Sequence, residues 1–295
     1  MTDFLSQSFN GLVGGSFYAL LALGLAVIFG MLRVVNFAHG AFYMLGAFGA
    51  YVLLAEWRVS FWWALLVVPV VLGLLGVVLE RTAIRRLSTL DPLYNFLFTF
   101  GLTLILQDVV KSRYGVQSNP YGAPPGLGGT VDFGLFDFPA YRVFVFALSI
   151  VLCCVVWWLL TRTRTGMVVR AATERPELTR ALGIDVGRWI APVFGFGVAL
   201  AALGGVLAAP MRAVNPLMGG DLIIGVFAVV VIGGLGSVFG SVAAGFGIGL
   251  LQAWSEAFAP QAIRGLLAQT LVFVLMAVVL LVRPAGLFGR EESPA

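Results

Sequence analysis

The sequence predicts an all-α integral membrane protein with about eight or nine transmembrane helices. Of its 295 residues, 60% are hydrophobic and only 11% are charged, whereas roughly 45–50% of the residues in a soluble domain are apolar. Several uncharged runs reach the length of about 20 residues that a helix needs to cross the hydrocarbon layer. These runs are continuous, whereas the strands of a membrane barrel would alternate over segments of about ten residues.

The apolar runs give the predicted spans in chain order. They cover residues 9–31, 40–55, 61–79, 93–110, 142–161, 189–210, 222–235, 239–257 and 266–283. The first two spans come from one run that is too long for a single crossing, and so do the seventh and eighth. Each long run must therefore contain an interruption, and we expect broken or re-entrant segments near 33–40 and 232–240.

The arginines predict which loops face the cytoplasm. They cluster at residues 81–86, at 162–188 and near the C-terminus, and basic loops stay on the cytoplasmic side of a membrane. We therefore expect one transmembrane domain over 1–295, with a cytoplasmic loop at about 162–188 and a loop on the opposite side at about 111–141. Arginines confined to loops are topology signals, so a nucleic-acid partner is not expected.

The first expected break, "RVVNFAHGAF" (33–42), contains Asn36, His39 and Gly40. Backbone groups at membrane depth must be hydrogen-bonded, so a broken helix is tolerated only where it is buried in protein or lines a water-filled cavity. Free N–H groups at such a break can hold a carboxylate. His39, the only histidine, either caps a helix start, contacts a substrate or takes part in proton coupling.

The second expected break contains Gly233, Gly234 and Gly236 within "VIGGLGSVFG" (231–240). Small residues at this spacing favour either close helix packing or a mobile break that lines a pathway. Both interpretations stay open at this point.

Thr99, Thr103 and Gln107 recur every four residues on one predicted helix. Residues at this spacing lie on the same helix face. They are either pathway residues or hydrogen-bonding contacts between helices.

The sequence holds no energy source or catalytic centre of its own. No predicted span has a carboxylate at its centre, which argues against a proton relay. A phosphate-binding loop requires G-x-x-x-x-G-K-[ST], but the single lysine, Lys111, follows "ILQDVV". One histidine and two cysteines are too few for a transition-metal site, and no nucleophile–base pair points to an enzyme. Any ATPase must be a separate polypeptide, and no cofactor is expected in this chain.

The cytoplasmic stretch 174–184 predicts a short helix from Pro176 to Leu182. Proline suits a first helical turn, and Gly183 suits the position just past the end. The expected apolar face holds Leu178, Ala181 and Leu182, and the remaining positions hold Glu177, Thr179 and Arg180. Such a helix either docks into the groove of a partner protein or lies on the lipid surface.

Three segments together carry a family resemblance. They are "NGLVGGSFYALLALGLAVIFGMLRVVNFAHGAFYMLGAF" (10–48), "ERPELTRALGI" (174–184) and "VIGGLGSVFGSVAAG" (231–245). With them, nearly the whole chain resembles the LivH-type permeases of branched-chain amino acid ABC importers. The resemblance implies a multi-pass protein of the bacterial inner membrane with no enzymatic activity. It also implies a second, LivM-like permease, two ATPase subunits that bind ATP and Mg²⁺, and a periplasmic substrate-binding protein.

The resemblance also implies roles for particular residues. Glu177 and Gly183 have the spacing of the Glu-Ala-Ala loop through which ABC permeases contact their ATPases, although Leu178 and Thr179 replace the two alanines. The implied contact residues are Glu177, Leu178, Arg180, Ala181, Leu182 and Gly183. The implied substrates are leucine, isoleucine and valine. Related permeases carry urea, short amides or other amino acids, and a stand-alone secondary transporter is the alternative from another class.

Overall fold

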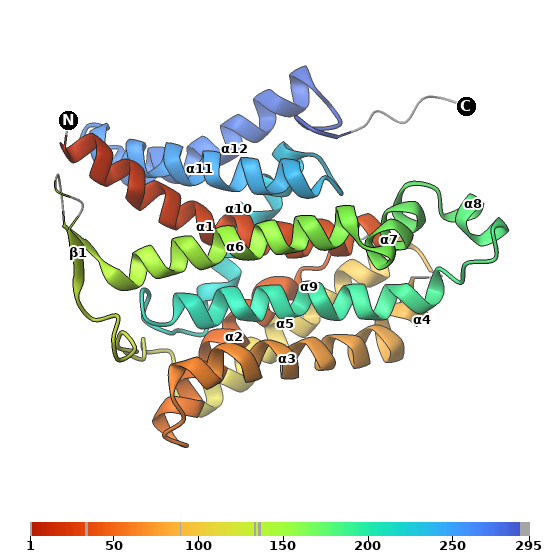
Figure 1. The fold of residues 1–295 in the computed structure, drawn as a ribbon, viewed down its shortest axis with the longest axis horizontal. Coiled ribbons are helices and arrows are strands. Elements are labelled where there is room, and N and C mark those ends of the chain that lie inside the picture. The colour runs from red at the N-terminus through yellow and green to blue at the C-terminus, as the bar shows by residue number, and fades with distance from the viewer. Residues whose placement is uncertain (1, 33–34, 89, 133, 135–136, 290–295) are drawn as a thin grey trace. The chain divides into compact units, whose positions relative to one another are not determined.

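The computed structural model describes residues 2–32, 35–88, 90–132, 134 and 137–289, most of which are helical (Figure 1). Within these residues, eight helices are long and apolar enough to cross a membrane. The predicted all-α membrane fold is therefore confirmed. By its contacts the chain forms two compact units. The first unit comprises residues 1–26, 123–153 and 224–295, and the second comprises 27–122 and 154–223.

The helices follow the predicted spans closely. In chain order they are α1 (Thr2–Leu32), α2 (Ala38–Ala55), α3 (Phe61–Leu79), the π-helical turn η1 (Glu80–Ile84), α4 (Arg85–Leu87), α5 (Pro92–Tyr114), α6 (Ala140–Arg162), α7 (Arg164–Glu174), α8 (Pro176–Ala181), α9 (Gly187–Ala208), α10 (Met218–Gly233), α11 (Val238–Phe258) and α12 (Arg264–Val282). The predicted span 222–235 corresponds to α10, whose 16 residues fall short of the roughly 20 that a full crossing needs.

Both predicted helix breaks are confirmed. Residues 35–37 separate α1 from α2, while Arg33 and Val34, which the prediction also included, lie outside the described residues. Residues 234–237 separate α10 from α11. Gly234 and Gly236 have φ angles of 106° and 82°, a left-handed conformation that glycine adopts without steric cost.

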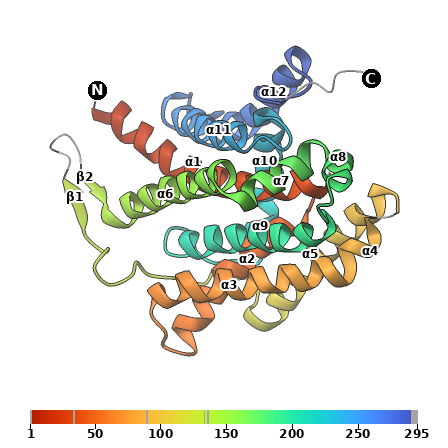
Figure 2. The ribbon, with the colours of Figure 1, turned by 45° about the vertical axis from the view of Figure 1, so that its right-hand side comes forward.

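The second unit is built on close contact of α2 and α3 with α9 (Figure 2). A Cβ atom on Gly46 of α2 would overlap the backbone of Ala202 in α9, and one on Gly205 of α9 would overlap the backbone of Tyr43. Small residues let helix backbones approach to this distance, which is how helices associate where the solvent is itself apolar. A buried apolar cluster fills the adjacent space, formed by Ile28, Ala38, Phe42, Ile84, Phe194, Val198 and Ala201.

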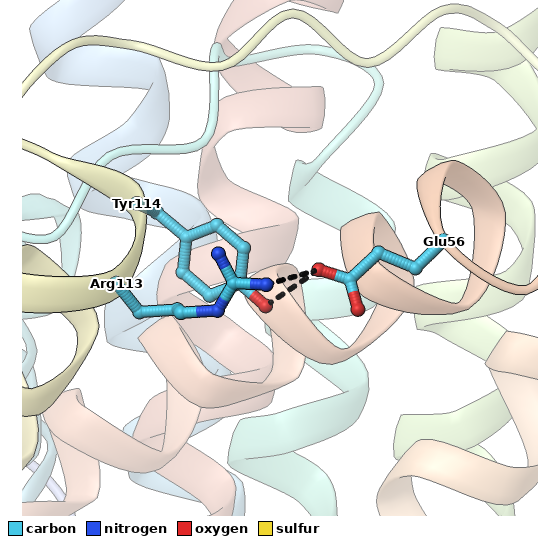
Figure 3. Close-up of polar contacts among 3 residues, drawn as sticks. All are labelled: Glu56, Arg113 and Tyr114. Atoms are coloured by element: carbon cyan, nitrogen blue, oxygen red, sulfur yellow. Dashed lines mark hydrogen bonds and ion pairs between the residues drawn. The ribbon is translucent and has the colours of Figure 1, made fainter.

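Polar contacts join the C-terminal ends of α2 and α5 in the second unit (Figure 3). The Tyr114 hydroxyl donates to the Glu56 carboxylate at 3.2 Å, and the Arg113 guanidinium lies 3.6 Å from the same oxygen. Both members of the ion pair are solvent-exposed, so the pair contributes about 0–1 kcal/mol.

The first unit pairs α11 with α12, and the N-terminal part of α1 packs on α11. A Cβ on Gly15 of α1 would meet the backbone of Phe246 at 2.9 Å. The segment after α12 returns to the end of α10, where the N–H groups of Leu287 and Phe288 donate to the carbonyls of Ile232 and Gly233 at 2.9 and 3.1 Å.

The two predicted loops contain more structure than the sequence indicated. In the loop at 111–141, α5 continues to Tyr114, and strands β1 (Thr130–Asp132) and β2 (Asp137–Pro139) form an antiparallel pair. Tyr121 is buried in this loop, and burial raises its pKa to about 12. The loop at 162–188 contains α7 in addition to the predicted short helix.

Gly46→Ala should destabilise the protein, because the added methyl group meets the Ala202 backbone, which cannot move without displacing α9. Overpacking of this kind costs about 1–3 kcal/mol. Gly101→Ala on α5 is the matched control, since nothing lies within 4 Å of its Cβ position. Thermal unfolding of both purified variants checks this, and equal melting temperatures would contradict the packing argument.

Candidate functional site

The first break forms the polar start of α2. The Asn36 Oδ1 atom accepts a hydrogen bond from the Ala38 N–H at 3.1 Å, and the Asn36 carbonyl accepts one from the His39 N–H at 3.2 Å. Asn36 and His39 are 3% and 0% exposed. Asn36 therefore satisfies a backbone donor that the start of a helix leaves free.

The residues of this break contact α5. The Phe37 N–H donates to the Thr99 Oγ1 atom at 3.3 Å, and the Phe37 ring meets the Phe96 ring edge-on at 5.0 Å. Thr99 lies about two turns, or about 10 Å, past the start of α5. The break is thus enclosed by the helices of the second unit, as expected for irregular backbone at membrane depth. His39 sits in the first turn of α2, and its substrate or proton-coupling role stays a prediction.

A buried polar stripe runs along α5. It consists of the predicted Thr99, Thr103 and Gln107 together with Asn95. Asn95 was not predicted from the sequence, although it continues the same four-residue spacing. Both threonine hydroxyls donate to carbonyls one turn back on α5, at 2.9 Å.

The far end of this stripe reaches the start of α10. A Cβ on Gly220 would lie 3.2 Å from the Gln107 Nε2 atom, and the backbones of Gly40 and Gly219 are in direct contact. The second unit therefore brings the first break, Gly40 and the polar residues of α5 into one region. The predicted Gly233, Gly234 and Gly236 belong to the first unit.

Among the buried side-chain atoms of the second unit that have no hydrogen-bond partner are atoms of Asn36, Asn95 and Glu80. The atoms concerned are the Asn36 Nδ2, both polar atoms of the Asn95 carboxamide and both oxygens of the Glu80 carboxyl group. Glu80 is only 1% exposed and begins the π-helical turn η1, one turn before Ile84 of the apolar cluster. Buried unpartnered polar atoms are rare in native proteins, because each one loses its hydration without compensation.

Glu80 was also missed by sequence reasoning, since it ends an apolar span beside an arginine cluster and looks like an interfacial residue. Single π-helical turns within α-helices occur frequently at functional sites. Together with Asn36 and Asn95, Glu80 extends the candidate site beyond the predicted residues.

The second break is tightly packed. The backbones of Gly233 and Gly240 touch across it, and the backbone of Gly234 lies against that of Gly289. The geometry thus shows the close-packing role that the sequence left open for Gly233. A role of Gly233, Gly234 and Gly236 in contacting substrate stays a prediction.

The short helix α8 exposes its apolar side chains. Leu178 and Leu182 are 54% and 81% exposed, and in Figure 1 α8 stands beyond the end of α9. Gly183, with a φ of 83°, ends the helix as predicted. Thr179 instead turns inward, is buried, and donates its hydroxyl to the Arg175 carbonyl at 2.9 Å. α8 therefore exposes apolar side chains together with the charged Glu177 and Arg180.

Within the part of the chain that the structure describes, no group of three or more His, Cys, Asp and Glu side chains could hold a metal ion. The eight membrane-length helices of the described residues define a multi-pass membrane protein. The chain belongs to the family described as "Branched-chain amino acid transport system / permease component", which matches residues 7–282.

Relatives match along nearly the whole chain. It is 30% identical over 310 residues to the "High-affinity branched-chain amino acid transport system permease protein LivH" of Escherichia coli, covering 98% of this chain and 96% of that protein. It is 30% identical over 311 residues to the corresponding permease protein BraD of Pseudomonas aeruginosa, covering 98% and 97%. It is 28% identical over 291 residues to a "Probable branched-chain amino acid transport permease protein LivH" of Methanocaldococcus jannaschii, covering 96% and 91%.

Thr99→Val should destabilise the protein, because it removes the hydroxyl that accepts a hydrogen bond from the partly buried Phe37 N–H. The expected cost is about 1–3 kcal/mol. Thr103→Val is the matched control, since the Thr103 hydroxyl bonds only within its own helix. Denaturation of the two variants in detergent checks this, and a Thr103→Val variant that unfolds as early as Thr99→Val would refute the assigned role of Thr99.

Proposed function

We propose that this chain is the permease subunit of an ABC importer that carries leucine, isoleucine and valine across the inner membrane into the cytoplasm. Family membership supports the permease role, and the names of relatives that match nearly the whole chain support the substrate class. The chain performs no covalent chemistry of its own, and ATP hydrolysis in separate subunits drives the transport cycle.

The proposed assembly contains a second, LivM-like permease, two ATPase subunits that bind ATP and Mg²⁺, and a periplasmic substrate-binding protein. The observation that carries this proposal is the exposed apolar face of α8, formed by Leu178 and Leu182. An exposed amphipathic helix with this face fits the groove of a partner protein. Glu177, Arg180, Ala181 and Gly183 complete the proposed contact with the ATPase. Movement of α8 would rock the membrane helices and open the pathway alternately to each side.

The proposed pathway passes the first break and the polar stripe of α5. A zwitterionic amino acid needs both donors and acceptors, and Asn36, Asn95 and Glu80 provide both kinds of atom without internal partners. A buried carboxyl group without hydrogen-bond partners is costly, so a passing ammonium group would find a hydrogen-bond acceptor at Glu80. Alternating access would open this region, whose polar residues are buried in the structure.

Two rival functions predict different results. A permease for urea or short amides would have the same subunit assembly but a different substrate. A secondary transporter would move solute without an ATPase. The test is the ATPase rate of the reconstituted complex with a substrate-binding protein loaded with leucine or with urea. Stimulation by the leucine-loaded protein alone is expected. Stimulation by the urea-loaded protein alone would show that the substrate is urea rather than a branched-chain amino acid. Transport of solute by the isolated chain would overturn the proposal of an ABC importer.

Leu178→Asp should abolish binding of the ATPase subunits, because a carboxylate replaces an apolar contact at the centre of α8. Membrane insertion should be unaffected, since α8 lies outside the eight candidate spans. Val116→Asp provides the control, as Val116 is 65% exposed in the loop on the opposite side. Co-purification of the ATPase with each variant checks this. Normal co-purification with Leu178→Asp would show that α8 is not the docking helix.

Asn95→Leu should raise the stability of the protein while slowing transport, because it removes two unpartnered polar atoms from the proposed pathway. The expected gain is about 1–3 kcal/mol. Ser149→Ala on α6 is the control, since the Ser149 hydroxyl is also buried and unpartnered but lies outside the stripe. It should stabilise the protein at an unchanged transport rate. Full transport by a stabilised Asn95→Leu variant would exclude Asn95 from the pathway.

A further inference from the structure

The second unit contains an apolar pocket of about 250 Å³ between α6, α7 and α9. On α9 its wall is formed by Trp189, Pro192, Val193 and Phe196. These residues recur every three or four positions, so the pocket follows one face of α9 for about 10 Å. Val156 on α6 lies in the opposite wall. The pocket is therefore a slot that runs along the membrane helices rather than across them.

Helix α7 borders this slot because the chain turns sharply after α6. The Thr163 hydroxyl caps α7 by accepting a hydrogen bond from the Gly166 N–H at 3.0 Å. A Cβ on Gly166 would overlap the carbonyl of Leu159, so α7 crosses the end of α6 in direct backbone contact. Thr165, Gly166 and Val169 then contribute to the lining of the slot.

Arginines precede and follow the α7 residues that line the slot. Arg164 and Arg170 are exposed and stand next to the lining residues Thr165 and Val169. The Arg170 guanidinium also donates to the Thr161 carbonyl, which holds it at the end of α6 at 3.3 Å. Residues 162–173 include three arginines and no acidic residue. Because arginine-rich loops stay inside, this end of the slot lies at the cytoplasmic face.

We propose that this pocket binds an anionic phospholipid of the cytoplasmic leaflet, with one acyl chain in the slot and the phosphate against Arg164 and Arg170. An apolar lining disfavours water as the occupant of a cavity of this size. A guanidinium group can form two parallel hydrogen bonds to the oxygens of one phosphate. Trp157 and Trp158 are exposed on α6 near the same end, at the level where tryptophan meets lipid headgroups. A bound lipid would hold α7 against α6 and so support the adjoining α8.

The headgroup contact is tested by native mass spectrometry of the purified full chain, titrated with phosphatidylglycerol or phosphatidylcholine. We expect about a thirtyfold preference for phosphatidylglycerol, from the attraction of two arginines to an anionic lipid. Arg164→Gln with Arg170→Gln should remove this preference. Arg81→Gln with Arg86→Gln removes the same charge from the same leaflet and should retain it. Equal binding of the two lipids by the unmodified chain would overturn the headgroup assignment.

The acyl-chain contact is tested with a phosphatidylglycerol that carries a photoreactive group near the end of one chain. It should label α9 around Val193 and Phe196 in the unmodified protein, and Val193→Trp, which fills the slot, should abolish this labelling. Because Val193→Trp changes a buried residue, the exposed arginine pair provides a second variant that leaves the helix packing intact. Persistent labelling of α9 in the Val193→Trp variant would overturn the proposal. A structure of the assembled complex in which the second permease occupies the slot would also overturn it.

Discussion

The structure depends on one constraint, which is that backbone N–H and C=O groups at membrane depth must be hydrogen-bonded within the protein. The two helix breaks meet this constraint differently. At the first break, the side chains of Thr99 and Asn36 accept hydrogen bonds from the backbone N–H groups of Phe37 and Ala38. At the second, N–H groups of the C-terminal segment bond the last carbonyls of α10. The Ser237 hydroxyl also accepts a hydrogen bond from the Gly240 N–H at 3.2 Å, so a polar side chain caps the helix that follows each break.

Close packing around the first break explains why polar atoms there remain without partners. Glycines bring α2 into backbone contact with α9 and with the start of α10, and little space is left for side chains to rearrange. Glu80 and Asn95 are buried in the second unit, and their side-chain polar atoms have no hydrogen-bond partner. A protein that tolerates such a cost does so where function requires it, because stability and activity are often in conflict at binding sites.

In the segment 162–188, apolar side chains are exposed although two threonine hydroxyls form local hydrogen bonds. Thr163 caps α7 and Thr179 bonds within α8, while Leu178 and Leu182 face outward. These local hydrogen bonds stabilise the two short helices α7 and α8. Their exposed faces are available to partners, which we propose to be the ATPase for α8 and a lipid for the slot beside α7.

The sequence by itself determined the membrane fold, the positions of the spans, both breaks and the short helix α8. Run length, glycine and proline suffice for these features, because in a membrane each span satisfies its own backbone. Only the tertiary structure decided that Glu80 and Asn95 are buried without partners and that Thr179 turns inward. It also showed α7, which buries Gly166, Val169 and Ala172. These features depend on contacts between distant segments, which local periodicity does not encode.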